Sequence, residues 1–402
     1  MSGRRTIIHL DLDAFYCAIE EQRDPALRGR AFAVGARPEQ RGVVASASYA
    51  ARQFGVHSAM PMGQALRLCP KLIVVPPKFP DYRAASQQVM QRLHALTALV
   101  EQISIDEAFL DVTELGAPGD ALAAQLQATI RSDLDMSCSL GVASNKLVAK
   151  IATDVGKSLV RSGQMPRAIC VVPPGDEAAF LAPLPTSALW GVGPKTAERL
   201  ALLGIHTIGA IAAWPADDLA RRFGQHGEDL ARRARGVDER SIVTEHAAKS
   251  ISQETTFVRD VGDRATLERT LQAQAAEIAQ KLRGKELVCS TVKLKIRWPD
   301  FTTPTRQLTL AQPTDSAERI GQAALQLFGQ IWPEGQPVRL IGVGVSGLAA
   351  PPRQLSLWDA PAAPSPEEQA RQQRVQAALA AIQARFGAGA LRRASEIGDE
   401  PS

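Results

Sequence analysis

Short apolar runs alternate with amphipathic segments over the first 172 residues. Residues 6–10 predict a buried strand, and the segment that follows Asp11 has the spacing of a helix. The same arrangement returns at Asp106 and Glu107, which two apolar strands enclose. Carboxylates are therefore expected where strands end. The expected strands of this part are 6–10, 31–34, 43–45, 103–105, 108–112 and 137–144, and the expected helices begin near 14, 81, 121 and 145.

The pattern changes twice further along the chain. Residues 176–240 predict short helices joined by glycine turns, and a charged linker at 235–246 follows them. A proline- and alanine-rich tail begins at Ala349, and an apolar stripe of helical spacing lies within it. Because segments of strand and helix pattern occur together on both sides of the helical segment, we expect an α+β fold with several domains. Between linker and tail we expect strands at 249–258, 288–297, 306–311 and 338–346, and helices at 263–283 and 315–331.

Composition limits the classes of protein that fit. A chain of 402 residues exceeds what one apolar core usually supports, so two to four domains are expected. The hydrophobic share of 45% and the charged share of 22% are typical of a globular protein, and they exclude a disordered or collagen-like chain. The net charge of +4 is compatible with a polyanionic partner but does not establish one.

Cysteine spacing and the amino terminus indicate the compartment. The five cysteines lie far apart without a C-x-x-C pair, so neither a zinc knuckle nor a disulfide framework is indicated. Acidic residues interrupt the first apolar stretch after a few positions, which argues against a signal peptide or a spanning helix. We expect a cytoplasmic protein with no membrane partner.

The strongest chemical signal is the pair of acidic strings L-D-L-D at 10–13 and S-I-D-E-A-F-L-D at 104–111. Carboxylates that share two metal ions can activate a hydroxyl and neutralise a leaving phosphate. Magnesium suits such oxygen ligands, and an aspartate inside an apolar strand is costly unless it is paired or metal-bound. The alternative is that Asp11 and Asp106 cap helices or turns. Two such strings in one chain weaken that alternative.

Five ordered strings carry a resemblance to a known family. They are H-L-D-L-D-A-F-Y, S-Y-A-A-R-Q-F-G-V, S-A-M-P-M-G-Q-A-L-R-L-C-P, S-I-D-E-A-F-L-D and A-K-I-A-T-D-V-G-K. Together they resemble the motifs of Y-family translesion DNA polymerases of the DinB branch, and the likeness runs from about residue 5 to 348.

The resemblance implies a template-directed DNA polymerase that adds deoxynucleotides to a primer 3′-end. Its partners would be primer-template DNA and deoxynucleoside triphosphates, and its role error-prone synthesis in DNA repair without a proofreading exonuclease. Two alternatives from other classes stay open. One is a non-catalytic DNA-binding accessory protein on the same fold, and the other is a palm-type nucleotide cyclase.

The resemblance also implies which residues hold metal. Asp11, Asp106 and Glu107 would bind two Mg²⁺ ions, with the main-chain carbonyl of Leu12 as a further ligand. Glu107 corresponds to the family's active-site acid. Asp13 and Asp111 are weaker candidates, because strand alternation can turn them toward structural partners.

Four residues would bind the incoming nucleotide. Tyr16 resembles the family's steric gate against a ribose 2′-hydroxyl, although an aromatic residue on a helix face is more often part of the core. Tyr49 and Arg52 share one helix face, which suits phosphate oxygens. Lys157 corresponds to the triphosphate-binding lysine. The loop after it is longer than the family's, so Arg161 is a candidate to share its role.

Two segments are expected to contact DNA. A glycine turn with Gly191, Gly193 and Lys195 resembles a helix-hairpin-helix, whose backbone N–H groups can approach a phosphate, although such turns often only cap a helix. The string T-V-K-L-K-I-R alternates apolar and basic residues, which places its cations on one sheet face. These cations, which suit a phosphate backbone, are Lys293, Lys295 and Arg297.

Two further features follow from the resemblance. The small residues Ala45 and Ala47 resemble a reduced roof over the nascent base pair. A string in the tail resembles the peptide that binds the bacterial sliding clamp, and its contact residues would be Gln354, Leu355, Leu357 and Trp358.

The domains implied are those of a right hand. The palm would comprise 1–11 and 80–172, the fingers 12–79, the helix-hairpin-helix thumb 173–240, and the mixed α/β little finger 245–348. Residues 349–402 would form the tail with the clamp-binding peptide and a short helix. We expect the protein to work as a monomer.

Overall fold

The computed structural model describes residues 5–160, 163–245 and 247–351, together with Arg374, Ala377, Ala378, Ala381 and Arg385. The chain divides into two compact units, Met1–Ala349 and Ala350–Ser402. Arg161, the clamp-binding string at 354–358 and the apolar stripe of the tail lie outside the described residues. The expectations for them stay predictions.

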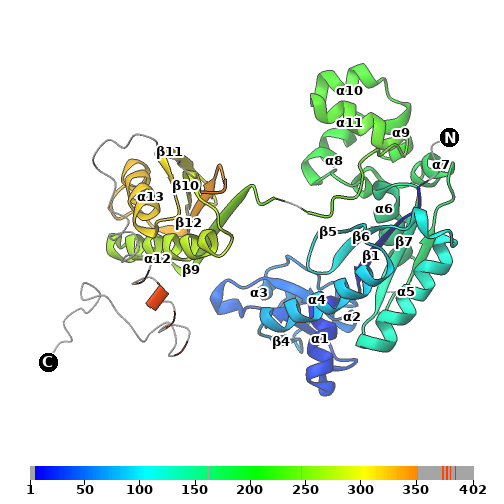
Figure 1. Ribbon diagram of the computed structural model, residues 1–402, viewed down its shortest axis with the longest axis horizontal. Coiled ribbons are helices and arrows are strands. Elements are labelled where there is room, and N and C mark those ends of the chain that lie inside the picture. Colours follow the sequence, from blue (N-terminus) through cyan, green and yellow to red (C-terminus); the bar gives the residue numbers. More distant parts are fainter. Residues whose placement is uncertain are drawn as a thin grey trace. The chain divides into compact units, whose positions relative to one another are not determined.

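A five-stranded sheet occupies the first part of the chain (Figure 1). Its strand order is β5-β6-β1-β7-β8, in which β1 runs antiparallel to both of its neighbours and β7 is parallel to β8. The strands are β1 Ile7–Leu12, β5 Val100–Gln102, β6 Glu107–Asp111, β7 Cys138–Ala143 and β8 Ile169–Val171. The helices that pack on it are α4 Phe79–Leu96, α5 Gly119–Leu134 and α6 Lys146–Ser158.

Strand alternation divides β1 between two apolar cores. Ile8 and Leu10 are buried in a core with side chains of α4 and α5. Ile7 is buried in another core, with side chains of α6. Because successive side chains of a strand point to opposite faces, His9 and Asp11 point to the face that α6 covers. The position of α6 therefore decides what surrounds the carboxylate of Asp11.

The strand expected at 103–105 is instead a turn, and β5 ends before it. The main-chain N–H groups of Ile103 and Ser104 both donate to the carbonyl of Glu107. The Ser104 hydroxyl oxygen accepts from the N–H groups of Asp106 (3.2 Å) and Glu107 (3.0 Å). A serine that bonds the main chain two and three residues further on favours a turn over a strand. The prediction of a strand was therefore wrong, and Asp106 lies in the turn.

A three-stranded sheet with order β3-β2-β4 follows β1 in the sequence. The hydroxyl oxygen of Ser48 accepts from the N–H of Ala51 and caps the short helix that carries Tyr49 and Arg52. The elements of this segment are α1 Phe15–Arg23, η1 Pro25–Leu27, β2 Phe32–Gly35, η2 Pro38–Gln40, β3 Val44–Ala47, α2 Tyr49–Arg52, α3 Met62–Leu68 and β4 Ile73–Val75.

Short helices fill the segment from residue 177 to 234, as the sequence predicts. Gly224 separates the last two helices with a positive φ of 64°, a backbone conformation that favours glycine. The helices are α7 Glu177–Leu181, α8 Pro194–Ala201, α9 Ile208–Ala213, α10 Ala216–Phe223 and α11 Gln225–Ala234. The 3₁₀ turn η4 Thr186–Ala188 lies between α7 and α8, and the 3₁₀ turn η3 Thr113–Leu115 follows β6.

An antiparallel sheet with order β11-β10-β12-β9 forms after the linker. Two helices pack on one of its faces and bury the apolar side chains of β10 there. The period-two pattern predicted this arrangement, because it places all apolar residues of a strand on one face. The elements are β9 Ser250–Val261, α12 Arg264–Arg283, β10 Cys289–Arg297, β11 Thr305–Thr314, α13 Ala317–Ile331 and β12 Val338–Ser346.

All five cysteines are free thiols, and four of them are buried. Burial raises the pKa of the Cys17 thiol to about 12 and that of Cys289 to about 11. Among the described residues, no helix combines the length and the apolar character that a membrane span requires.

Candidate active site

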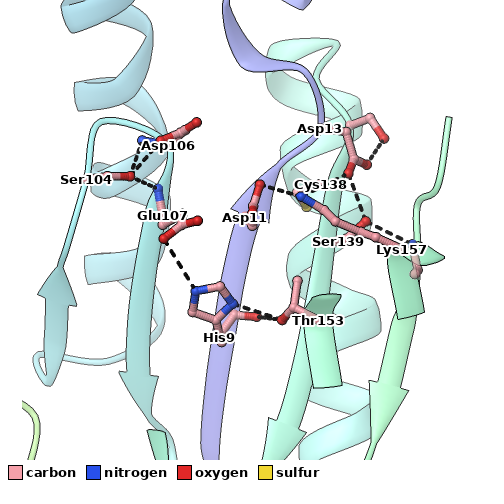
Figure 2. A network of polar contacts seen from close by, with 12 residues as sticks. His9, Asp11, Asp13, Ser104, Asp106, Glu107, Cys138, Ser139, Thr153 and Lys157 are labelled. Atoms are coloured by element: carbon pink, nitrogen blue, oxygen red, sulfur yellow. Dashed lines mark hydrogen bonds and ion pairs between the residues drawn. The ribbon is translucent and has the colours of Figure 1, made fainter. Parts of the chain in front are cut away.

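Three acidic residues meet at one end of neighbouring strands. Asp11 in β1 and Glu107 in β6 are direct cross-strand partners. The next main-chain bond in register joins the N–H of Leu12 to the carbonyl of Asp106 at 3.0 Å. Directly opposed residues of an antiparallel pair have Cβ atoms about 4.5–5.5 Å apart. The fold therefore places the backbones of Asp11, Asp106 and Glu107 side by side, although 95 positions separate the first two in the sequence (Figure 2).

The turn before β6 fixes the Asp106 side chain. The Ser104 hydroxyl donates to Oδ1 of Asp106 at 2.6 Å while its oxygen accepts from the two main-chain N–H groups described above. Figure 2 shows the Asp106 carboxylate at the tip of this turn. Ser104 was not among the predicted site residues, although its position two residues before Asp106 was a signal present in the sequence.

Two lysines of α6 contact the other two carboxylates. Lys157 Nζ lies 2.5 Å from Oδ1 of Asp11, and Lys150 Nζ donates to Oε2 of Glu107 at 2.9 Å. Burial raises the pKa of Asp11 to about 6, and the ammonium of Lys157 opposes this effect. Lys150 was not predicted, although its spacing of seven residues from Lys157 puts both on one helix face.

The donor set suits magnesium, but the side chains do not surround a single point. Within the described part of the chain, no group of three Asp, Glu, His or Cys side chains is arranged to hold a metal ion. The carboxylates of Asp11 and Glu107 face lysines instead. The expected convergence is thus present in the backbone and not in the side-chain rotamers. Three carboxylates and a main-chain carbonyl at this spacing have the chemistry that Mg²⁺ prefers.

Asp13 and Asp111 have structural partners, the role that the sequence analysis favoured for them. Asp13 is fully buried and accepts hydrogen bonds from the hydroxyls of Ser137 (2.7 Å) and Ser139 (2.8 Å). Asp111 accepts from the main-chain N–H of Thr113 at 3.0 Å. Their oxygens are therefore committed to the turns and strands around them.

A cavity of about 560 Å³ lies over the acidic strand ends. Its wall includes most of the predicted metal and nucleotide residues, together with Asp154 and Ser158 of α6, which the sequence analysis did not single out. The predicted residues that line it are Asp11, Leu12, Tyr16, Tyr49, Arg52, Asp106 and Lys157.

Aromatic neighbours hold the ring of Tyr16 at the cavity wall. The ring stacks on Tyr82 with centroids 4.3 Å apart and an interplanar angle of 15°. Phe79 meets it edge-on at 6.1 Å. Desolvation raises the pKa of the Tyr16 phenol, and the nearby Asp106 adds to this effect. Tyr16 therefore packs against the core with one face and lines the cavity as well.

Tyr49 and Arg52 also reach the cavity together. The Arg52 guanidinium lies over the Tyr49 ring at 5.2 Å, and its Nε donates to the carbonyl of Ala47. Ala45 lines the cavity, whereas Ala47 is fully buried among the apolar residues of the three-stranded sheet. Ala45 is therefore placed to contact what the cavity holds, and the predicted roof over the nascent base pair stays a prediction for both residues.

The expected DNA contacts lie on exposed turns and strand faces. Gly191 has a positive φ of 97°, and Gly193 precedes α8, whose first turn carries the exposed Lys195. In β10, Lys293 is exposed, and Lys295 and Arg297 are half-buried on the polar face.

This polar face of β10 is not uniformly basic. Lys295 Nζ donates to Oε1 of Glu254 in β9 at 2.7 Å. The sequence pattern of β10 alone could not reveal the acid, because Glu254 belongs to a strand that β12 separates from β10.

Models of one protein family match most of the chain. Residues 10–154 match the impB/mucB/samB family, residues 248–357 match the C-terminal domain of that family, and residues 174–205 match its HHH motif.

Similar proteins include "DNA polymerase IV" of Streptomyces coelicolor, which is 43% identical over 350 residues, or 86% of this chain and 71% of the relative. "DNA polymerase IV" of Dehalococcoides mccartyi is 38% identical over 392 residues, or 96% of each chain.

Solved structures also match. The "Y-family DNA polymerase chimera Dbh-Dpo4(243-245)-Dbh" superposes with a TM-score of 0.76 at 25% identity, covering 86% of this chain and 100% of the other. The "Insertion ternary complex of Dbh DNA polymerase" superposes with a TM-score of 0.59 at 25% identity and the same coverage.

Proposed function

Since this chain belongs to the impB/mucB/samB family and is a template-directed Y-family DNA polymerase of the translesion type, we propose that its acidic strand ends hold two Mg²⁺ ions for nucleotidyl transfer. The observation that carries this proposal is the cross-strand pairing of Asp11 with Glu107, with Asp106 in the adjoining turn. The main-chain carbonyl of Leu12 is the fourth proposed ligand. When bound, the ions would activate the primer 3′-hydroxyl and neutralise the charge on the phosphates.

The residues around the cavity would bind the incoming nucleotide. Arg52 and Tyr49 present a guanidinium and a phenol from one short helix, a geometry that suits phosphate oxygens. Lys157 supplies a compact positive charge from α6. Its ammonium must leave Asp11 Oδ1 to reach a triphosphate, so we propose that nucleotide binding exchanges one anionic partner of Lys157 for another.

The domains of a right hand follow from the same proposal. The five-stranded sheet would be the palm (1–11 and 80–172), the three-stranded sheet the fingers (12–79), and α7–α11 the thumb (173–240). The four-stranded sheet would be the little finger (245–348). Gly191, Gly193 and Lys195 of the thumb would contact the phosphate backbone through main-chain N–H groups and one cation.

The basic residues of β10 should set the salt dependence of DNA binding. Lys293→Gln should weaken binding of primer-template DNA and reduce the slope of log K against log salt concentration by about 1, because each neutralised phosphate releases a counterion. A fluorescence-anisotropy titration at several salt concentrations measures this slope. Lys285→Gln is the matched control, since Lys285 is exposed just after α12, the helix that packs on the apolar face of the sheet. An unchanged slope for Lys293→Gln would remove β10 from the interface.

The tail would bind the sliding clamp through Gln354, Leu355, Leu357 and Trp358. Deletion of residues 354–358 should abolish the stimulation of synthesis by the clamp while synthesis without the clamp is retained. Primer-extension rates with and without the clamp measure this, and undiminished stimulation after the deletion would refute the role.

We also propose that the protein is a monomer in the cytoplasm, a reducing compartment in which free thiols such as these persist.

One assay separates this function from its alternatives. The purified chain with Mg²⁺, all four deoxynucleoside triphosphates and a primer-template should extend the primer by the templated bases. An accessory protein would bind the DNA without extension, and a nucleotide cyclase would convert a triphosphate without any template.

A further inference from the structure

A histidine lies directly behind the acidic strand ends. His9 is fully buried in β1, two residues before Asp11 and on the same face of the sheet. Its Nδ1 is 2.8 Å from the hydroxyl of Thr153 in α6. Its Nε2 has no hydrogen-bond partner among the described residues and lies 4.0 Å from Oε2 of Glu107 (Figure 2). The ring therefore connects α6 to a proposed metal ligand.

A buried ring nitrogen without a hydrogen-bond partner is costly, because it has lost its bonds to water. In a neutral imidazole ring, one nitrogen donates a hydrogen bond and the other accepts one. The hydrogen-bond partners on each side decide which nitrogen carries the proton.

The single hydroxyl proton of Thr153 has three acceptors within reach. They are Nδ1 of His9 at 2.8 Å, the carbonyl of Ala149 at 3.1 Å and the carbonyl of His9 at 3.4 Å. The shortest distance is to Nδ1. Donation there leaves the ring proton on Nε2, where it faces a carboxylate. The other tautomer would direct a lone pair at the Glu107 oxygen, which is unfavourable for two acceptors. The geometry therefore selects Nε2–H.

A glycine allows Thr153 to come this close. Gly141 of β7 is the cross-strand partner of His9. A Cβ at this position would overlap the carbonyl oxygen of Ala149 and lie 2.7 Å from Oγ1 of Thr153. The close approach of α6 to the sheet is thus centred on the contact between Thr153 and His9, and the fold holds the ring in place from both sides.

We propose that His9, with its tautomer set by Thr153, is a positioning residue that donates Nε2–H to Oε2 of Glu107. A rotation of Glu107 that moves Oε2 about 1 Å toward the ring completes this hydrogen bond. The bond takes the place of the one from Lys150 and leaves Oε1 free for an ion shared with Asp11. The inference rests on the proposed role of Glu107 as a metal ligand, and it assigns to His9 the orientation of that ligand.

Two pairs of variants of the full-length chain test whether Thr153 and His9 position Glu107 in this way. Asparagine in place of His9 keeps an amide near the position of Nδ1 and removes the donor at Nε2, whereas glutamine places its amide nitrogen near Nε2. His9→Asn should therefore weaken Mn²⁺ binding by about 10- to 100-fold, the usual effect of losing a partner of a metal ligand. His9→Gln should restore most of the affinity. The free Mn²⁺ signal in electron paramagnetic resonance measures binding without any turnover.

The second pair alters the tautomer and leaves the ring in place. Thr153→Val has the same shape and lacks the hydroxyl, so it should weaken Mn²⁺ binding and shift the Mg²⁺ dependence of extension to higher concentration. Thr153→Ser keeps the hydroxyl and should do neither. The Thr153 pair also decides the question if His9→Asn does not fold, as judged by circular dichroism and thermal melting.

The outcomes distinguish a hydrogen-bonding role of His9 and Thr153 from a role in packing alone. Equal loss in all folded variants would mean that only packing matters and would overturn the proposal, as would unchanged Mn²⁺ affinity in Thr153→Val. Loss in His9→Asn and Thr153→Val with recovery in His9→Gln and Thr153→Ser would support it. Failure of the unaltered chain to extend a primer would refute the proposed function itself. If the unaltered chain does extend a primer, the variants test only the proposed role of His9 and Thr153 in positioning Glu107.

Discussion

Replacement of Asp106 by alanine should reduce the rate of primer extension by about 10³-fold or more, because a carboxylate that holds a metal ion supplies several kcal/mol of transition-state stabilisation and each 1.36 kcal/mol is tenfold in rate. The affinity for primer-template DNA should stay close to that of the unaltered chain. Asp106 lies in a turn, and its side chain bonds only Ser104 among the described contacts. Alanine keeps the main-chain bond from the Leu12 N–H to the carbonyl of residue 106, so the substitution should not disturb the sheet. Single-turnover extension and an anisotropy titration measure the two quantities.

A second acidic residue of the same region provides the control for this result. Asp120 is exposed in the first turn of α5 and does not line the cavity. Asp120→Ala should therefore extend primers at the rate of the unaltered chain. Extension by Asp106→Ala at a rate similar to that of Asp120→Ala would refute the assignment of Asp106 as a ligand.

Loss of the Tyr16 ring should raise ribonucleotide incorporation by roughly ten- to a hundredfold relative to deoxyribonucleotides. The reason is steric: forcing extra atoms against a fixed ring costs about 1–3 kcal/mol, and Tyr16→Ala removes that cost for a 2′-hydroxyl. The ring is well fixed, because it stacks on Tyr82 and meets Phe79 edge-on. The ratio of kcat/KM for a deoxynucleotide to that for the matching ribonucleotide is the measurement.

Tyr16→Phe separates the ring from its hydroxyl. Phenylalanine keeps the stacking surface against Tyr82, so the sugar selectivity should remain that of the unaltered chain. A gate that acts through sterics predicts a loss of selectivity in Tyr16→Ala alone. Equal selectivity in Tyr16→Ala and Tyr16→Phe would remove the gate role.

Most secondary structure could be predicted from periodicity. The strand β10 and the helix α12 lie within a residue or so of their predicted positions, because each has a sustained period of one kind and clear ends. The strand predicted at 103–105 failed, since the side chain of Ser104 bonds the main chain and forms a turn. Local hydrogen bonds of this type do not alter the apolar pattern, so the pattern could not reveal them.

The acidic residues of the site could be predicted from the sequence, but the side-chain contacts that they make could not. The acidic strings and their resemblance to a family identified Asp11, Asp106 and Glu107, but no spacing in the sequence encodes which strands pair. The contacts of Lys150 and Lys157 with these carboxylates depend on how closely α6 packs, and that depends on Gly141 in a different strand. Such docking distances are set by tertiary packing and leave no periodic signal.

Two metal ions at the ends of β1 and β6 are the central requirement of the proposed mechanism. Anomalous diffraction from crystals of the chain with primer-template DNA, a non-hydrolysable deoxynucleoside triphosphate and Mn²⁺ tests this directly. We expect two peaks about 3.5–4 Å apart, with carboxylate oxygens of Asp11, Asp106 and Glu107 about 2.2 Å from them. Well-ordered DNA and nucleotide with Mn²⁺ bound only to other residues would contradict it.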